Sequence, residues 1–169
     1  MARFRISSNQ EPQAETPVLL FRDLRKQPTI KFLWGHQEKL LDQYYAKHLD
    51  TSDLAIELPT GSGKTLVGLL IGEFRRRVRC ERVVFLCPNR QLCFQVEAQA
   101  RTYGVPVALL VGKQNQYDPA VFSKYQEAKA IAVRPTAVYS TPTPGSTTRS
   151  VSSATTPMQV TASSLRYGR

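Results

Sequence analysis

Apolar residues recur every three to four positions in several stretches of the chain. This spacing predicts helices over residues 36–49, 64–78 and 90–103, and a further helix that begins at Asp118. Gly104 is typical of the residue that ends a helix, and the pair Asp118-Pro119 is typical of a helix start. The chain is therefore expected to contain several amphipathic helices.

Short, continuous apolar runs separate these helices. They lie at residues 54–58, 83–87, 106–111 and 130–133. Such runs are typical of strands that are buried on both faces. Strands that alternate with helices predict an α/β fold, with a parallel sheet and flanking helices.

The two ends of the chain differ from this pattern. Residues 1–28 are polar, with prolines at positions 12, 17 and 28, and we expect a flexible N-terminal segment there. Residues 134–169 contain no Asp or Glu and are rich in Ser and Thr, which predicts a disordered tail. Residues 29–133 remain as the folded domain.

The charge of the chain points toward polyanions. The formal net charge is +10 and the pI is about 9.9, as expected of a protein that binds nucleic acid or nucleotide phosphates. The alternative is a soluble protein with surplus surface arginine. Four arginines crowd one helix end, where we expect a solvated last turn that suits the helix dipole: Arg75, Arg76, Arg77 and Arg79.

Other classes of protein fit less well. Three cysteines rule out a disulfide scaffold, and with two histidines away from them no zinc spacing exists. Cys87 and Cys93 lie in or beside apolar runs and are expected to be buried. Neither a signal peptide nor a membrane span is present, so we expect an intracellular (cytoplasmic) protein without membrane contact.

A glycine-rich loop between the first predicted strand and the second helix carries the clearest chemistry. Its glycines let backbone N–H groups turn around a β-phosphate, and the helix dipole adds a positive field. Lys64 can reach the β- and γ-phosphates, and Thr65 offers a hydroxyl to Mg²⁺. The alternative is a glycine-rich turn with an incidental lysine. The expected nucleotide-binding residues are Pro59, Thr60, Gly61, Ser62, Gly63, Lys64 and Thr65.

This loop, Pro-Thr-Gly-Ser-Gly-Lys-Thr, resembles motif I of the superfamily-2 DEAD/DEAH-box helicases. The segment after the second predicted strand is similar to their motif Ia, which contacts the phosphate backbone of nucleic acid. An arginine at a helix start can share such a phosphate with backbone N–H groups. The alternative is a strand-to-helix loop with an Asn cap. The resemblance implies nucleic-acid contacts at Pro88, Asn89, Arg90, Gln91 and Gln95.

His36-Gln37 resembles the start of these helicase domains, where a glutamine reads adenine. A glutamine amide can pair with both N6 and N7 of adenine. The alternative is an ordinary polar residue in a first helical turn. Phe32 and Trp34 can stack near a base, but we favour a core role for both.

The resemblance covers residues 30–133 and implies the first part of a RecA-like P-loop NTPase fold. It implies ATP and Mg²⁺ as cofactors, with single-stranded or duplex nucleic acid, DNA or RNA, as partner; it leaves the oligomeric state open. No apolar strand here ends in the acidic pair of motif II, so hydrolysis through Lys64 is expected to be very weak. The alternatives are a non-catalytic binding module and a P-loop ATPase outside the helicases.

The change of composition after Val133 suggests a shifted reading frame. New codons can be built from the last base of one codon and the first two of the next. Over residues 154–158 (Ala-Thr-Thr-Pro-Met) they spell Asp-Asp-Ala-His, if the free bases are G, G, G and C. That sequence is similar to motif II of a DExH-type helicase. The alternative is a natural disordered tail.

Overall fold

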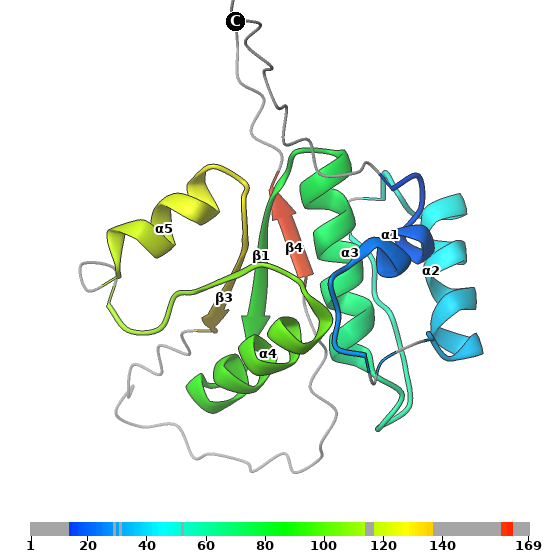
Figure 1. Cartoon of the computed structure of the whole chain (residues 1–169), viewed down its shortest axis with the longest axis horizontal. Coiled ribbons are helices and arrows are strands. Elements are labelled where there is room, and N and C mark those ends of the chain that lie inside the picture. Colours follow the sequence, from blue (N-terminus) through cyan, green and yellow to red (C-terminus); the bar gives the residue numbers. More distant parts are fainter. Residues whose placement is uncertain are drawn as a thin grey trace, which may run out of the picture.

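The computed structural model describes residues 14–28, 30, 32–51, 53–113, 117–136 and 160–163. Figure 1 shows their arrangement around a small sheet. The helices and strands in chain order are α1 (Pro17–Asp23), α2 (Gly35–Lys47), α3 (Lys64–Val78), β1 (Arg82–Cys87), α4 (Arg90–Tyr103), β2 (Val107–Leu109), α5 (Pro119–Gln126), β3 (Ile131–Pro135) and β4 (Val160–Ser163).

The sheet has the strand order β2-β3-β1-β4. β1 and β2 both pair with β3 in parallel, so the predicted parallel α/β architecture is confirmed for these strands. β4 pairs with β1 in the antiparallel direction, with Val84 opposite Thr161. Because the parallel strands run the same way, their carboxyl ends meet at one edge, and the arrowheads of β1 and β3 point to it in Figure 1.

Helices α3 and α4 pack on the parallel strands and on each other. The core between them holds fully buried side chains from both layers, among them Leu69 and Leu70 of α3, Val83 of β1, and Ile131 of β3. β1 alternates half-buried and buried positions, while the first three residues of β3 are all buried. This two-layer packing places the beginnings of α3 and α4 at the carboxyl edge of the sheet (Figure 1).

One predicted strand is absent. Residues 54–58 form neither strand nor helix and lie outside the sheet, and Leu54 and Ile56 are exposed. The prediction rested on apolar content, which by itself does not create a pairing partner. In the structure β3 and β4 occupy the two neighbouring positions of β1, so no edge of β1 remains for this segment.

Both predicted disordered ends contain ordered residues. Residues 17–23 form α1, where the Thr16 hydroxyl accepts from the Leu19 N–H and Pro17 opens the first turn; the same proline had suggested flexibility. Leu20 and Phe21 of α1 are buried. At the other end, Arg134 and Pro135 complete β3 and residues 160–163 form β4. Residues 1–13 and most of the predicted tail lie outside the described residues.

The expectation of a solvated arginine turn after α3 is also wrong. Glu73 is fully buried and accepts two hydrogen bonds from Arg76, each 2.8 Å, and one from Arg77 at 2.6 Å. Arg75 binds Glu81 at 2.6 Å. Arg79 reaches Glu81 and Asp50 as well. We call these four arginines and their three carboxylates the arginine cluster; it fixes the end of α3 rather than facing solvent.

Candidate nucleotide and nucleic-acid site

The glycine-rich loop folds as a tight turn ahead of α3. The Ser62 N–H and the Ser62 hydroxyl both donate to the Pro59 carbonyl, at 3.2 and 2.6 Å. Gly61 and Gly63 each have a φ of +81°, which L side chains rarely adopt. The residues predicted from the sequence to cradle phosphate thus form one continuous turn at the N-terminus of a 15-residue helix.

Two side chains of α2 hold this loop through one atom. The Ser62 carbonyl accepts from Gln37 Nε2 at 2.8 Å and contacts His36 Nε2 at 3.0 Å. A carbonyl oxygen only accepts, so His36 must carry its proton on Nε2 for this bond to form. The Gln37 Oε1 atom accepts from the Trp34 N–H at 3.0 Å. We call this pair, His36 and Gln37, the loop clamp.

The first turn of α3 offers unbonded donors to a ligand. The helix-type bonding begins with the Val67 N–H, which donates to the Gly63 carbonyl at 3.2 Å. Within the described residues, the N–H groups of Lys64, Thr65 and Leu66 therefore have no acceptor, and Gly63 has no side chain to cap them. Three N–H groups at the positive end of a helix dipole form a site for an anion.

The electrostatics favour an anion at the same place. Among the described residues Lys64 and Arg90 have no ion-pair partner, while the arginines at the far end of α3 are held by carboxylates. Neither α3 nor α4 carries an acidic residue in its first turn. Two cations without an ion-pair partner among the described residues therefore lie at the carboxyl edge of the sheet, and the arginines held by carboxylates lie at the other end of α3.

The predicted motif Ia segment opens α4. The Asn89 side chain accepts from the Leu92 N–H at 2.9 Å, so it acts as the N-cap, as the structural alternative proposed. Arg90 and Gln91 are exposed, and so is Gln95 one turn further on. These side chains are accessible for contacts with a strand of nucleic acid beside the sheet edge.

Gln37 and the aromatic residues before it differ from expectation. Gln37 is 4% exposed, and both ends of its amide bind protein backbone. This geometry supports a loop-holding role, and the adenine contact stays a prediction. The expected core role of Phe32 and Trp34 is wrong, because they are 82% and 58% exposed. The Trp34 and His36 rings lie 5.5 Å apart in an edge-on arrangement, which brings Trp34 close to the loop clamp.

His36 is the residue that sequence reasoning missed. It stood beside Gln37 in the same motif, but its partner is a backbone carbonyl 26 residues further along the chain. No side-chain pattern marks a backbone acceptor. The only available signal was its position in the first turn of a helix that precedes the glycine-rich loop.

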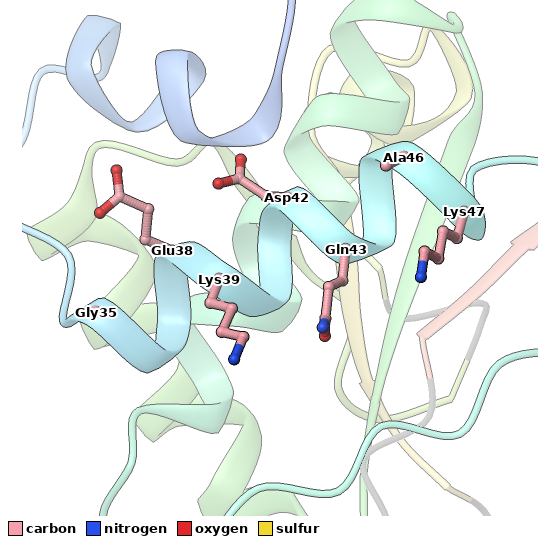
Figure 2. A pocket seen from close by; sticks show the side chains of 7 residues that line it. All are labelled: Gly35, Glu38, Lys39, Asp42, Gln43, Ala46 and Lys47. Carbon is pink, nitrogen blue, oxygen red and sulfur yellow. The ribbon is translucent and has the colours of Figure 1, made fainter.

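A hollow over the outer face of α2 is not part of this site. Figure 2 shows its lining, which mixes acidic and basic side chains and includes no residue of the glycine-rich loop. Acidic groups disfavour polyphosphate, and the charges disfavour a base. The residues that line this hollow are Gly35, Glu38, Lys39, Asp42, Gln43, Ala46 and Lys47.

The cysteines do not form a metal site. Burial raises the pKa of the Cys87 thiol to about 12, helped by the neighbouring Cys93, so both thiols stay protonated. Their predicted burial is confirmed. The described part of the chain contains no cluster of three His, Cys, Asp or Glu side chains suited to a metal, and none of its helices is long and apolar enough to cross a membrane.

Comparison with known proteins gives one match. The family model described as DEAD/DEAH box helicase matches residues 35–153. The match starts at the first residue of α2 and includes the loop clamp, the glycine-rich loop and α4. It continues past Val133, so the resemblance is not confined to residues 30–133 as predicted. No curated protein and no solved structure matches the chain.

Proposed function

Because this chain belongs to the DEAD/DEAH box helicase family, we propose that its glycine-rich loop binds ATP with Mg²⁺ and that the start of α4 binds a strand of nucleic acid. Members of this family generally use ATP with Mg²⁺ and act on nucleic acid. We further place the chain in superfamily 2, as the DExH type, and its folded part in the first RecA-like domain.

The observation that carries the ATP proposal is the first turn of α3. Within the described residues, three N–H groups without an acceptor and Lys64 without an ion-pair partner follow a loop that the clamp holds through the Ser62 carbonyl. Such an arrangement fits a β-phosphate cradled by backbone, with the Lys64 ammonium at the β- and γ-oxygens. The half-buried Thr65 fits as the protein's hydroxyl ligand for Mg²⁺, with phosphate oxygens supplying further ligands.

We propose that hydrolysis by this chain is very weak. In the described part of the chain, no strand is followed directly by an acidic residue: β1 leads into Pro88, β2 into Leu110, and β3 into Thr136. A carboxylate in that position is what holds the metal from the far side and orients the attacking water. Binding without efficient turnover is the expected behaviour, which also describes a non-catalytic binding module.

Nucleotide binding has a built-in reporter, because Trp34 is the only tryptophan and lies beside the clamp. We expect ATP with Mg²⁺ to change its emission, and Lys64→Ala to abolish that response at the same ATP concentration. Lys39→Ala removes an exposed lysine from the outer face of α2 and should leave the response intact. An unchanged response in Lys64→Ala would overturn the proposed site.

Turnover is tested with the same variants. Phosphate release is measured with single-stranded DNA and then RNA present, and we expect a rate near background for the wild-type chain. Steady turnover comparable with intact helicases, lost in Lys64→Ala, would show that the missing carboxylate is not needed or is supplied from elsewhere. ATP binding and hydrolysis are thus decided separately.

The reading-frame hypothesis for residues from about 134 onward stays a prediction. The family match to residue 153 and the pairing of residues 160–163 as β4 are favourable to the alternative, a natural sequence. The nucleotide sequence across residues 130–160 decides between them. Stop codons in the shifted frame, or no acidic pair after an apolar run, would end the hypothesis.

A further inference from the structure

Phe94 is a large apolar side chain that the fold leaves in solvent. It is 51% exposed on α4, whose opposite face buries Cys93, Val96 and Ala100. A single exposed ring on a protein surface is ordinary by itself. The residues around it on the helix indicate what it could bind.

The surroundings of Phe94 are polar and carry positive charge. Arg90 lies four residues before it, hence on the same helix face, and has no ion-pair partner among the described residues. Gln91 and Gln95 flank the ring with exposed amides. The first carboxylate on this helix is Glu97, whose Oε1 is held by Arg101 at 3.1 Å. No carboxylate on the helix therefore competes for Arg90.

An exposed ring beside a cation favours a single-stranded polynucleotide over a protein as the partner of this surface. A protein partner would use a contiguous apolar patch, but no other large apolar side chain of α4 is exposed among the described residues. A single-stranded polynucleotide offers phosphates for a cation and flat bases for a ring, alternating along one chain. Four residues, about 6 Å along the helix axis, separate Arg90 from Phe94, which is the scale of one nucleotide.

We propose that Phe94 is a stacking platform for a base of the single strand whose phosphate Arg90 contacts. This inference rests on the proposed function and adds a residue that reads the strand through its bases. The Arg90 contact is indifferent to the base and sensitive to salt. The Phe94 contact requires a base and is insensitive to salt, because the ring carries no charge.

The test compares two labelled oligonucleotides of equal length and charge, oligo(dT) and an abasic strand, in the absence of nucleotide. Phe94→Ala should weaken oligo(dT) binding about 5- to 100-fold, with no change for the abasic strand or in the slope of log K against log salt. Phe94→Trp should restore oligo(dT) binding. Arg90→Gln should weaken both strands and lower the salt slope by about one.

A matched control uses Phe32→Ala, which removes another exposed ring from the segment before α2 and should not alter binding of either strand. Unchanged urea midpoints confirm that the variants fold, as expected for exposed side chains.

The outcomes separate the two claims. If the wild-type chain binds neither strand, the proposed nucleic-acid function fails, and this inference fails with it. If it binds oligo(dT) but Phe94→Ala binds equally well, or loses both strands alike, the stacking role is overturned while the proposed function stands. Loss of self-association in Phe94→Ala, measured by sedimentation, would make the ring a protein contact and would also overturn it.

Discussion

Gly63 and Gly61 allow the loop clamp to be tested by substitutions that differ in one respect only. Both have a φ of +81°, so alanine at either position meets the strain of left-handed backbone, about 1–2 kcal/mol. A Cβ at Gly63 would overlap Gln37 Nε2, whereas a Cβ at Gly61 has no atom within 4 Å. The difference between the two variants therefore measures the clamp.

The size of that difference follows from what Gln37 must give up. To make room it has to leave its hydrogen bonds to the Ser62 carbonyl and the Trp34 N–H, at 2.8 and 3.0 Å. Each contributes about 0.5–1.5 kcal/mol net, so Gly63→Ala should cost about 1–3 kcal/mol more than Gly61→Ala. Gly35→Ala, in open space at a helix start, should be neutral or slightly stabilising.

The assay is urea unfolding followed by circular dichroism, on the three alanine variants and on Gly63→Ala combined with Gln37→Ala. In the Gln37→Ala background the overlap is gone, so Gly63→Ala should cost no more than Gly61→Ala. The coupling in this double-mutant cycle should equal the 1–3 kcal/mol expected above, within about 0.5 kcal/mol. Equal costs for Gly63→Ala and Gly61→Ala in the wild-type chain would refute the clamp reasoning.

Two further predictions concern groups outside the loop. Glu73→Gln removes the counter-charge of the buried arginines and should lower the free energy of unfolding by about 3–5 kcal/mol. Glu97→Gln breaks an exposed pair and should lower it by under about 1 kcal/mol. Urea midpoints compare the two variants, and similar losses would contradict the burial argument. A thiol reagent at pH 8 should modify exposed Cys80 rapidly in the native protein and Cys87 and Cys93 only after denaturation. The reason is that burial shields the Cys87 and Cys93 thiols and raises their pKa. Rapid labelling of all three cysteines in the native protein would show that the core is accessible to solvent.

Local patterns predicted the helices well, because their determinants are local. α3 and α4 begin and end where their apolar spacing, Asn89 cap and Gly104 cap indicated. The same reasoning failed for residues 54–58, because strand pairing depends on which neighbour fills the sheet position. The apolar residues at 54–58 do not reveal that another strand, such as β4 about 100 residues further along the sequence, pairs with β1 instead.

The candidate site also has parts that the sequence could predict and parts that it could not. The glycine-rich loop could be located because its residue types at fixed spacing are what phosphate chemistry needs. The clamp could not, since Ser62 takes part through its carbonyl, which every residue has. The arginine cluster was missed although Glu73 lies three and four residues before Arg76 and Arg77, the spacing of side-chain pairs on one helix face. The full burial of Glu73 depends on the fold and could not be predicted from that spacing.

The arginine cluster has a consequence for how the protein meets a polyanion. Its three carboxylates hold Arg75, Arg76, Arg77 and Arg79, so this end of α3 exerts little long-range field despite its composition. Lys64, at the other end of the same helix, has no ion-pair partner among the described residues, so we expect that end to contribute more to the steering field. If the proposed strand binding holds, we expect the strand to be steered toward Lys64 and fewer counterions to be released on association than a net charge of +10 suggests.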